Sequence, residues 1–366
     1  MTINIFITGA SGYIGGTVLS TLAVEKHPEF NYRALVRNQD VADKICKAYK
    51  NVTPVIGDLD RLELLEEEAS KADIVVNTAD VDHTISPPAI LRGLSKPLPN
   101  DTTPPKNRFL IHTSGTSILI DKSFGTYITE HIYNDWQAVD ELVYKLPDDA
   151  WHRPADKTVL FNEVAPRAQS VYEAIICPPC IYGKGTGPGK VVSFQMPELI
   201  KHFVKHGKGF TVNEGETVWG NVHVLDLAEL YAALFDKALS SSSGTPEPGL
   251  WNQEGYFLAA TGEHHWGDVQ RLTTHAMNQK GLLKISETDK LKPEEVSAIA
   301  GLVVAPLIWG CNSRGMAERG PVKLGWRGGR GTRQPPIGWW VTGRAQGIGR
   351  REIDEEIKFY EDGLVP

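Results

Sequence analysis

The chain has 366 residues, of which 41% are hydrophobic and 23% charged, and its formal net charge is −7. These values predict a globular protein with one large α/β domain or two smaller ones. The negative charge argues against nucleic acid or an anionic membrane as the main partner. The longest apolar stretch, residues 298–309, is interrupted by Gly301 and Pro306 and is too short to span a bilayer. Four cysteines are too few for a dense disulfide framework. Because the first apolar run is the strand of the glycine motif, we expect no signal peptide and a cytoplasmic protein.

The first sixteen residues combine an apolar β-type run, Ile3 to Thr8, with glycines at positions 9, 12 and 15 and a helical pattern from Thr17. Each glycine has a physical role in dinucleotide binding. One permits a tight turn, one lets the backbone approach a pyrophosphate, and one lets the helix pack closely on the strand. The helix N-terminus offers free N–H groups to the phosphates. Such a triplet is weak evidence alone, but its place between strand and helix favours a nucleotide site over a structural turn.

Strands and helices alternate along the next hundred residues. The pattern predicts, in chain order, a strand at 31–36, a helix at 41–49, a strand at 52–56, an acidic helix at 61–70, a strand at 72–77, a short helix at 89–94 and a strand at 108–112. Strands that alternate with helices at this spacing form a parallel, doubly wound sheet of the Rossmann type, which sets the fold class as α/β.

Beyond residue 116 the pattern is less regular. Residues 130–146 are partly helical in pattern and are interpreted as an excursion over the active-site face. The remaining predicted elements are a crossover helix at 152–163, a strand at 171–176, a glycine-rich loop at 183–189, a helix at 197–206, a helix from 226 to 239, a strand at 256–260, and helices at 266–278 and 351–360.

These elements predict an NAD(P)-binding Rossmann domain over residues 1–190. A smaller, discontinuous substrate lobe follows over 191–325, interleaved with the last elements of the sheet. Residues 326–350 show no apolar periodicity, although they contain a second glycine motif at 342–349. Because too few residues follow that motif for a βαβ unit, we interpret 326–350 as an irregular insertion and 351–366 as a C-terminal helix.

Two stretches carry a family resemblance: Thr8-Gly9-Ala10-Ser11-Gly12-Tyr13-Ile14-Gly15 and Pro179-Cys180-Ile181-Tyr182-Gly183. With them the chain resembles the extended short-chain dehydrogenases/reductases, close to the NAD-dependent epimerase/dehydratase-like proteins. The resemblance implies that the glycine loop, the ends of the following strands and the segment after strand 171–176 bind the cofactor. The implied residues are Gly9, Ser11, Gly12, Tyr13, Ile14, Gly15, Asp58, Asn77, Thr78, Ala79, Thr113, Pro178 and Ile181.

The residue after the second strand bears on the choice of cofactor. An acidic residue there would hold the ribose 2′-hydroxyl of NAD, but Arg37 follows Val36 in this chain. A guanidinium can bind a 2′-phosphate through paired hydrogen bonds. We therefore favour NADP(H) over NAD(H), with a plain surface charge as the alternative reading of Arg37.

The chain departs from the family at the catalytic Tyr-x-x-x-Lys pair. At the expected place, His152 stands where tyrosine belongs and Asp156 stands where lysine belongs. The resemblance implies that Ser114 hydrogen-bonds the substrate carbonyl. Three interpretations of the acid/base stay open: His152, a tyrosine from the excursion (Tyr127 or Tyr133), or a protein that binds cofactor without turnover.

Other motifs are weaker. Cys177 and Cys180 form a C-x-x-C pair, but it ends a strand rather than opening a helix, which argues against a redox role. His202 and His206 lie one helical turn apart with no third ligand near them in sequence, so we expect no metal.

From the sequence we expect an NADP(H)-dependent oxidoreductase or an epimerase/dehydratase-like enzyme that acts by hydride transfer on a small carbonyl or hydroxyl compound. The resemblance also raises the option of a homodimer. The alternative is a non-catalytic NADP(H)-binding regulator that resembles the NmrA-like redox sensors, which the missing Tyr-x-x-x-Lys pair favours.

Overall fold

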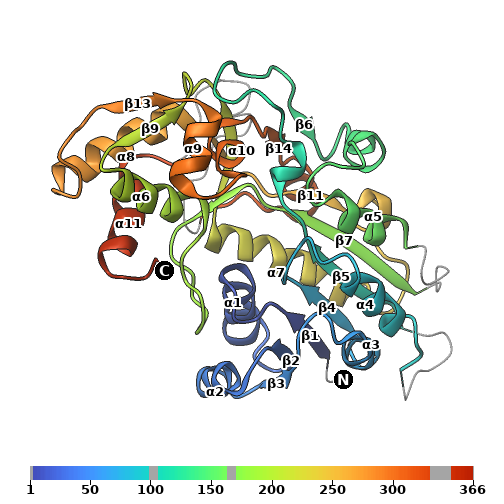
Figure 1. Ribbon diagram of the computed structural model, residues 1–366. Helices are drawn as coiled ribbons and strands as arrows, with labels where there is room; N and C mark the ends of the chain where they lie inside the picture. Colours follow the sequence, from blue (N-terminus) through green and yellow to red (C-terminus); the bar gives the residue numbers. More distant parts are fainter. Residues whose placement is uncertain (1–2, 99–105, 163–169, 330–347, 366) are drawn as a thin grey trace.

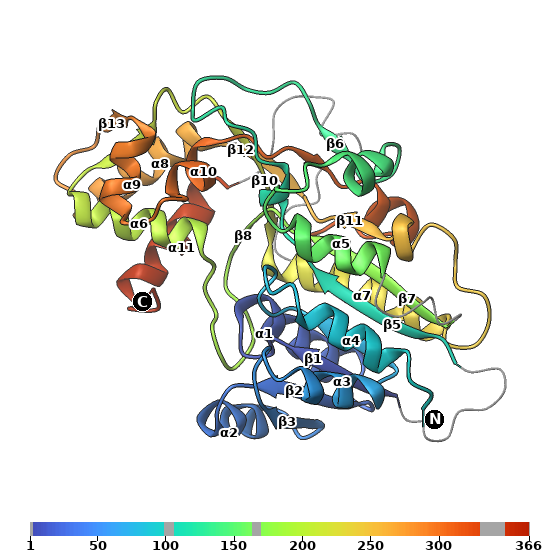
Figure 2. The same cartoon turned by 45° about the vertical axis from the view of Figure 1, so that its right-hand side comes forward.

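The computed structural model describes residues 3–98, 106–162, 170–329 and 348–365. Most of the predicted insertion at 326–350 therefore lies outside the described residues. Within these ranges the chain forms a central sheet layered between helices and a second lobe of helices and short strands, which lies at the upper left in Figures 1 and 2.

The central sheet has seven strands, and every neighbouring pair is parallel. In spatial order they are β11 (Tyr256–Leu258), β7 (Val171–Cys177), β5 (Arg108–Thr113), β4 (Ile74–Asn77), β1 (Asn4–Thr8), β2 (Asn31–Val36) and β3 (Val52–Ile56). The order reverses direction between β1 and β4, which is the topological switch point where open α/β sheets bind ligands. The predicted doubly wound parallel sheet is confirmed.

Helices cover both faces of this sheet, because its strands are apolar on both sides. Helix α1 contacts α7 on one face, whereas α4 contacts both α3 and α5 on the other (Figure 2). The helices of this half are α1 (Tyr13–Ser20), which continues as a π-helical turn at Thr21–Lys26, α2 (Gln39–Ala48), α3 (Leu62–Ser70), α4 (Ser86–Leu94), α5 (Arg153–Phe161) and α7 (Val224–Ser240).

Most of the second lobe follows β7 in the chain. Its helices are α6 (Gln195–His206), α8 (Trp266–Gln279), α9 (Pro293–Ala300), α10 (Ala305–Gly310) and α11 (Arg350–Glu361). Its strands pair as β12 (Gly262–His265), β10 (Val218–His223) and β8 (Cys180–Tyr182) in one small sheet, β13 (Thr288–Leu291) with β9 (Gly209–Val212), and β14 (Gly315–Met316) with β6 (Tyr133–Asn134). Short helical turns lie at Thr116–Leu119, Glu141–Lys145, Asn252–Glu254 and Gly320–Leu324.

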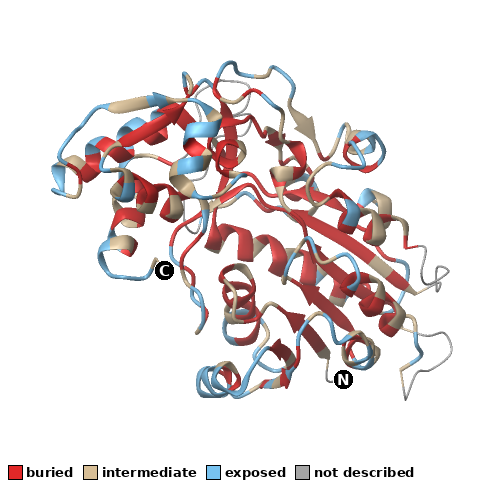
Figure 3. Cartoon of the chain, in the orientation of Figure 1, coloured by how far each residue is buried: buried red, intermediate tan, exposed pale blue. Residues whose placement is uncertain are grey.

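Two hydrophobic clusters hold these parts together, and Figure 3 shows the central strands as almost wholly buried. One cluster follows the sheet and includes Phe6, Val75 and Ile111. The other lies in the lobe around Trp219 and Trp309, and helix α11 adds Ile353 to it by packing on α6 and α8. Each helix of the described residues is too short or too polar to cross a membrane.

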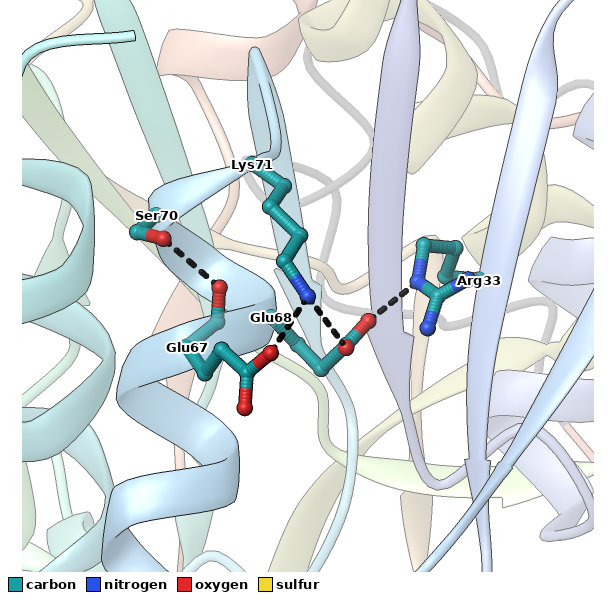
Figure 4. Close-up of polar contacts among 5 residues, drawn as sticks. All are labelled: Arg33, Glu67, Glu68, Ser70 and Lys71. Carbon is teal, nitrogen blue, oxygen red and sulfur yellow. Dashed lines mark hydrogen bonds and ion pairs between the residues drawn. The ribbon is translucent and has the colours of Figure 1, made fainter. Parts of the chain in front are cut away.

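A buried carboxylate pins α3 to the sheet. Glu68 of α3 is 3% exposed and pairs with Arg33 of β2 and with Lys71, whose ammonium also binds Glu67 at 2.7 Å (Figure 4). Burial alone would raise the pKa of Glu68, but the hydrogen bonds from Arg33 and Lys71 outweigh it and hold the pKa below its usual value. The hydroxyl of Ser70 donates to the carbonyl of Glu67 at 2.7 Å at the C-terminal end of the helix.

The structure corrects the sequence pattern at two places. Residues 130–146 form β6 and a single π-helical turn at Glu141–Lys145 rather than a longer helix. The Asn134 side chain accepts the N–H groups of Trp136 and Gln137, at 2.7 and 2.8 Å, and this turn interrupts a helix there. The pair His264–His265, which falls between the predicted strand at 256–260 and the predicted helix at 266–278, belongs to β12.

Candidate functional site

The glycine loop after β1 is closed by close backbone contacts. Gly9 has a φ of +73°, and a Cβ placed on it would lie 2.6 Å from the Thr78 carbonyl oxygen. A Cβ on Gly15 would lie 2.2 Å from Thr78 Oγ1. At Gly12 the nearest atom to such a Cβ is the Gly9 carbonyl oxygen, at 3.1 Å. Gly9 and Gly15 are thus required by the fold, whereas Gly12 is the least crowded of the three positions.

Helix α1 begins directly behind this loop. Its N-cap is Gly12, which has no side chain to accept the first N–H groups of the helix. These groups and the positive end of the helix dipole favour an anion at this position.

A cavity of about 360 Å³ lies on the β2 and β3 side of the loop. Arg37 lines it and forms no ion pair with any residue that the structure describes. Two carboxylates line it as well, but Asp58 accepts the N–H of Asp60 at 3.1 Å and Asp80 accepts the N–H of Asp82 at 3.0 Å. The other lining residues include the predicted Gly9, Ser11, Gly12, Thr78 and Ala79.

A second cavity of about 540 Å³ lies on the other side of the loop and shares Gly12 and Thr78 with the first. The predicted Tyr13, Ile14, His152 and Ile181 line it. The remaining lining residues are Asp82, Ser117, Trp151, Pro179, Lys190, Val192, Ser193, Phe194, Gln195, Val304 and Ile308. The two cavities therefore meet at the glycine loop, at the carboxyl ends of the strands.

His152 is held in this second cavity by a carboxylate and an indole. Its Nδ1 lies 2.8 Å from Asp82 Oδ1, and its ring stacks on Trp151 with an interplanar angle of 7°. The hydrogen bond with His152 outweighs partial burial and lowers the pKa of Asp82, so the carboxylate stays ionised. His152 occupies the N-cap of α5 with a φ of +65°, an uncommon backbone conformation for a residue other than glycine. Its Nε2 makes no hydrogen bond with the described residues.

Ser114 faces the protein interior. Its hydroxyl donates to Asp156 Oδ2 at 2.8 Å, and the hydroxyl of Tyr256 donates to the same oxygen at 2.8 Å. Burial raises the pKa of Asp156 to about 6, although both hydrogen bonds favour the ionised form. Because Ser114 does not line the cavity, the geometry gives no support to its expected contact with a substrate carbonyl. Ser117, in the turn at Thr116–Leu119, is the serine that lines the cavity.

The two tyrosines of the excursion lie away from both cavities. Tyr127 is 53% exposed, and Tyr133 lies in β6 with its ring against His131 at 4.5 Å. Neither lines either cavity. Of the three interpretations of the acid/base, the geometry favours His152 over these tyrosines.

Three of the predicted cofactor residues make their contacts within the protein instead. The Asn77 side chain bonds Thr8 and His112. Thr113 Oγ1 lies 2.7 Å from the Tyr231 hydroxyl, and the Pro178 carbonyl accepts the N–H of Thr116 at 2.9 Å. All three residues lie outside the cavity linings.

The segment predicted as a glycine-rich loop at 183–189 packs, together with Lys190, directly on the glycine loop. The N–H of Lys190 donates to the Ser11 carbonyl at 3.0 Å, and Lys190 lines the cavity beside Gly12 and Tyr13. A Cβ on Gly189 would lie 2.2 Å from the Ser11 oxygen, so glycine is required for this approach. The glycines before Lys190 are visible in the sequence, but their packing against Ser11 is not, because the two segments are far apart in the chain.

Gly183 starts this segment and is held from two sides. Its carbonyl accepts the Tyr13 hydroxyl at 2.6 Å, and its N–H donates to Glu356 of α11 at 2.9 Å. Its φ is +87°, and a Cβ there would lie 2.1 Å from the His223 ring. Burial raises the pKa of Glu356 to about 8.

Among the described residues, the weaker motifs form neither a disulfide nor a metal site. Cys177 and Cys180 are free and buried, and burial raises the pKa of both thiols far above the usual value, which disfavours a reactive thiolate. In the described part of the chain, no three His, Cys, Asp or Glu side chains gather as a metal site would require.

No protein-family model matches the chain. Over 335 residues it is 32% identical to the oxidase ucsJ of an Acremonium species, and the alignment covers 89% of this chain and 93% of that protein. The dTDP-glucose 4,6-dehydratase (rfbB) of Bacillus anthracis, solved in complex with NAD, gives a TM-score of 0.61 at 14% identity over 99% of this chain and 97% of that chain. The yeast methylglyoxal/isovaleraldehyde reductase Gre2, complexed with NADPH, gives 0.57 at 13% over 99% and 100%. At these identities the solved structures establish a shared fold.

Proposed function

Because this chain belongs to the extended short-chain dehydrogenases/reductases, we propose that it is an NADP(H)-dependent oxidoreductase that acts on a small carbonyl or hydroxyl compound. The observation that carries the proposal is the pair of cavities that meet at the glycine loop. Arg37, which has no ion-pair partner among the described residues, lines one, and the His152–Asp82 pair lies in the other. The oxidase ucsJ supports an oxidoreductase, and the NAD and NADPH complexes of the solved structures support a nicotinamide cofactor.

The residues present fit a dinucleotide. The uncrowded position at Gly12 and the uncapped start of α1 suit a pyrophosphate, since a longer side chain at Gly12 would fill that space. The guanidinium of Arg37 suits the 2′-phosphate, and Lys190 lies where it can approach the pyrophosphate. When bound, NADP(H) would supply or accept a hydride at its nicotinamide ring.

His152 takes the role of the missing tyrosine. The Asp82 carboxylate accepts a hydrogen bond from Nδ1–H, which leaves Nε2 as the nitrogen that exchanges a proton with the substrate oxygen. In the reducing direction, imidazolium gives its Nε2 proton to the carbonyl oxygen while a C–H bond forms at the carbonyl carbon. In the oxidising direction, neutral imidazole takes the hydroxyl proton at the same nitrogen. Ser117 lines the same cavity, and in this proposal its hydroxyl donates a hydrogen bond to that oxygen.

The test separates binding from turnover. NADPH is titrated by fluorescence and its oxidation is followed with a panel of carbonyl compounds. We expect His152→Ala to lower kcat by about a hundredfold or more, the usual contribution of a general acid, with NADPH affinity unchanged. Tyr127→Phe is the control, because Tyr127 lies outside both cavities and its loss should leave the rate intact.

A non-catalytic NADP(H)-binding regulator is the second candidate. It is favoured by the turn of Ser114 toward Asp156, which replaces the usual Ser-Tyr-Lys arrangement with a buried carboxylate network. Tight NADPH binding with no turnover across the carbonyl panel, in both wild type and His152→Ala, would select this candidate.

A further inference from the structure

The larger cavity is apolar on the side built by the second lobe. Val192, Phe194, Val304 and Ile308 line it there, and Trp151 and Ile181 add to the apolar surface. Phe194 remains 49% exposed, so a large aromatic ring is left in contact with solvent at this site. Displacement of water from such a wall by an apolar ligand is favourable, because it removes apolar surface from water.

The charged groups of the cavity are few. The backbone N–H of Lys190 donates to Ser11, which holds this lysine beside the proposed pyrophosphate site, and His152 and Asp82 pair with each other. Among the described lining residues there is no other lysine and no arginine. The Gln195 amide is occupied too, since its Nε2 donates to the Ile308 carbonyl at 3.0 Å.

This distribution disfavours a charged substrate. A sugar linked to a nucleoside diphosphate carries a second diphosphate, which would need its own cations when it leaves water. The described lining offers one lysine, which the cofactor pyrophosphate would use, and an ionised Asp82 that repels an anion. The solved dehydratase shares the fold, but among the residues that the structure describes, the substrate wall of this chain lacks the charges that such a ligand requires.

We infer that the substrate is an uncharged, apolar ketone or aldehyde, or the corresponding alcohol, with an aryl or branched alkyl substituent that contacts Trp151, Phe194 and Val304. Phosphorylated compounds and nucleotide-linked sugars are excluded. The inference names the substrate class for the site of the proposed function and rests on that proposal for the chemistry, but the apolar ligand site is testable without cofactor.

The experiment uses the full chain without cofactor and prodan, an uncharged naphthyl ketone whose emission shifts to the blue in apolar surroundings. We expect a saturable blue shift that excess UDP-glucose does not reverse. Val304→Asp puts a carboxylate into the cavity wall and should weaken prodan binding by about tenfold or more. Val304 is only partly buried at the start of α10, so a carboxylate there keeps access to solvent and this variant should fold, which its melting curve checks.

Val303→Asp is the matched control, because the neighbouring valine is 84% exposed and does not line the cavity. It should bind prodan like the wild type. Equal binding by both variants, or displacement of prodan by UDP-glucose, would overturn the inference. A parallel NADPH titration keeps the two proposals apart: apolar binding with no NADPH affinity contradicts the proposed function alone, and the reverse result contradicts this inference alone.

Discussion

Gly12→Val tests the cofactor site with the least disturbance of the fold. Gly12 has φ −77° and ψ 173°, a region that valine adopts readily, and its Cβ would approach the protein no closer than 3.1 Å. The branched side chain would instead extend into the space shared by the two cavities. The variant should therefore fold, with a loss of about 1 kcal/mol because valine is a poorer N-cap than glycine.

The loss of cofactor affinity should be much larger. A pyrophosphate displaced from the start of α1 loses at least two hydrogen bonds to a charged group, each worth about 1.5–3 kcal/mol. A total of about 3 kcal/mol or more corresponds to at least about a hundredfold weaker NADPH binding. Fluorescence titration of NADPH measures the affinity, and urea unfolding measures the stability.

Two further variants separate the effect on cofactor binding from the effect on the fold. Gly12→Ala places one carbon at the same position and should weaken NADPH binding less than valine does. Gly15→Ala should instead destabilise the fold, because its Cβ would lie 2.2 Å from Thr78 Oγ1 and 2.3 Å from the Gly9 oxygen. If Gly12→Val folds and binds NADPH with wild-type affinity, the glycine loop is a structural turn and the cofactor site is wrong.

Three other predictions follow from the same geometry. Arg37→Asp should weaken NADPH binding by about 2 kcal/mol and leave NADH binding unchanged, whereas wild-type affinity for NADH equal to that for NADPH would refute the cofactor preference. Asp82→Asn should lower kcat without changing NADPH affinity, because the amide no longer fixes the Nδ1–H tautomer of His152; an unchanged pH–rate profile would exclude that positioning role. Glu356 has a folded pKa of about 8, above its unfolded value, so its stabilising contribution is complete at low pH and is lost as pH rises toward 8. As the pH rises from the unfolded pKa of this carboxyl toward 8, the free energy of unfolding of Glu356→Gln should increase relative to the wild type by up to about 1.4 kcal/mol per pH unit, measured by urea unfolding. If the free energies of the two proteins change in parallel with pH, the burial of this carboxyl is contradicted.

The parallel sheet could be predicted because its signals are local. Each strand is a short apolar run next to a turn or helix signal, and strands such as Asn31–Val36 and Val52–Ile56 match their predicted bounds. The strands of the second lobe could not be predicted in the same way. Val218–His223 contains a glycine and an asparagine, and it becomes a strand because β8 and β12 pair with it from distant parts of the chain.

In the candidate site, too, the residues with local sequence signals could be predicted and the long-range contacts could not. The glycine loop and Arg37 sit beside local strand signals, and the structure places both at a cavity. The direction of the Ser114 side chain depends on Asp156, which lies 42 residues later in the chain. Asp156 in turn binds Tyr256, a further 100 residues along. The partner of His152 is Asp82, 70 residues earlier in the chain. No local pattern encodes such pairs, because they form when the crossover connections bring the strand ends together.

The Gly183 peptide also bears on how this protein folds. Its two hydrogen bonds reach Tyr13, 170 residues away, and Glu356, 173 residues away. Contacts of such separation are slow to form, because the entropy of closing long loops must be overcome before they contribute any energy. In a refolding experiment, helical circular dichroism should therefore recover before the cavity at the glycine loop does. Competence to bind the dinucleotide would then appear as one of the last events of folding.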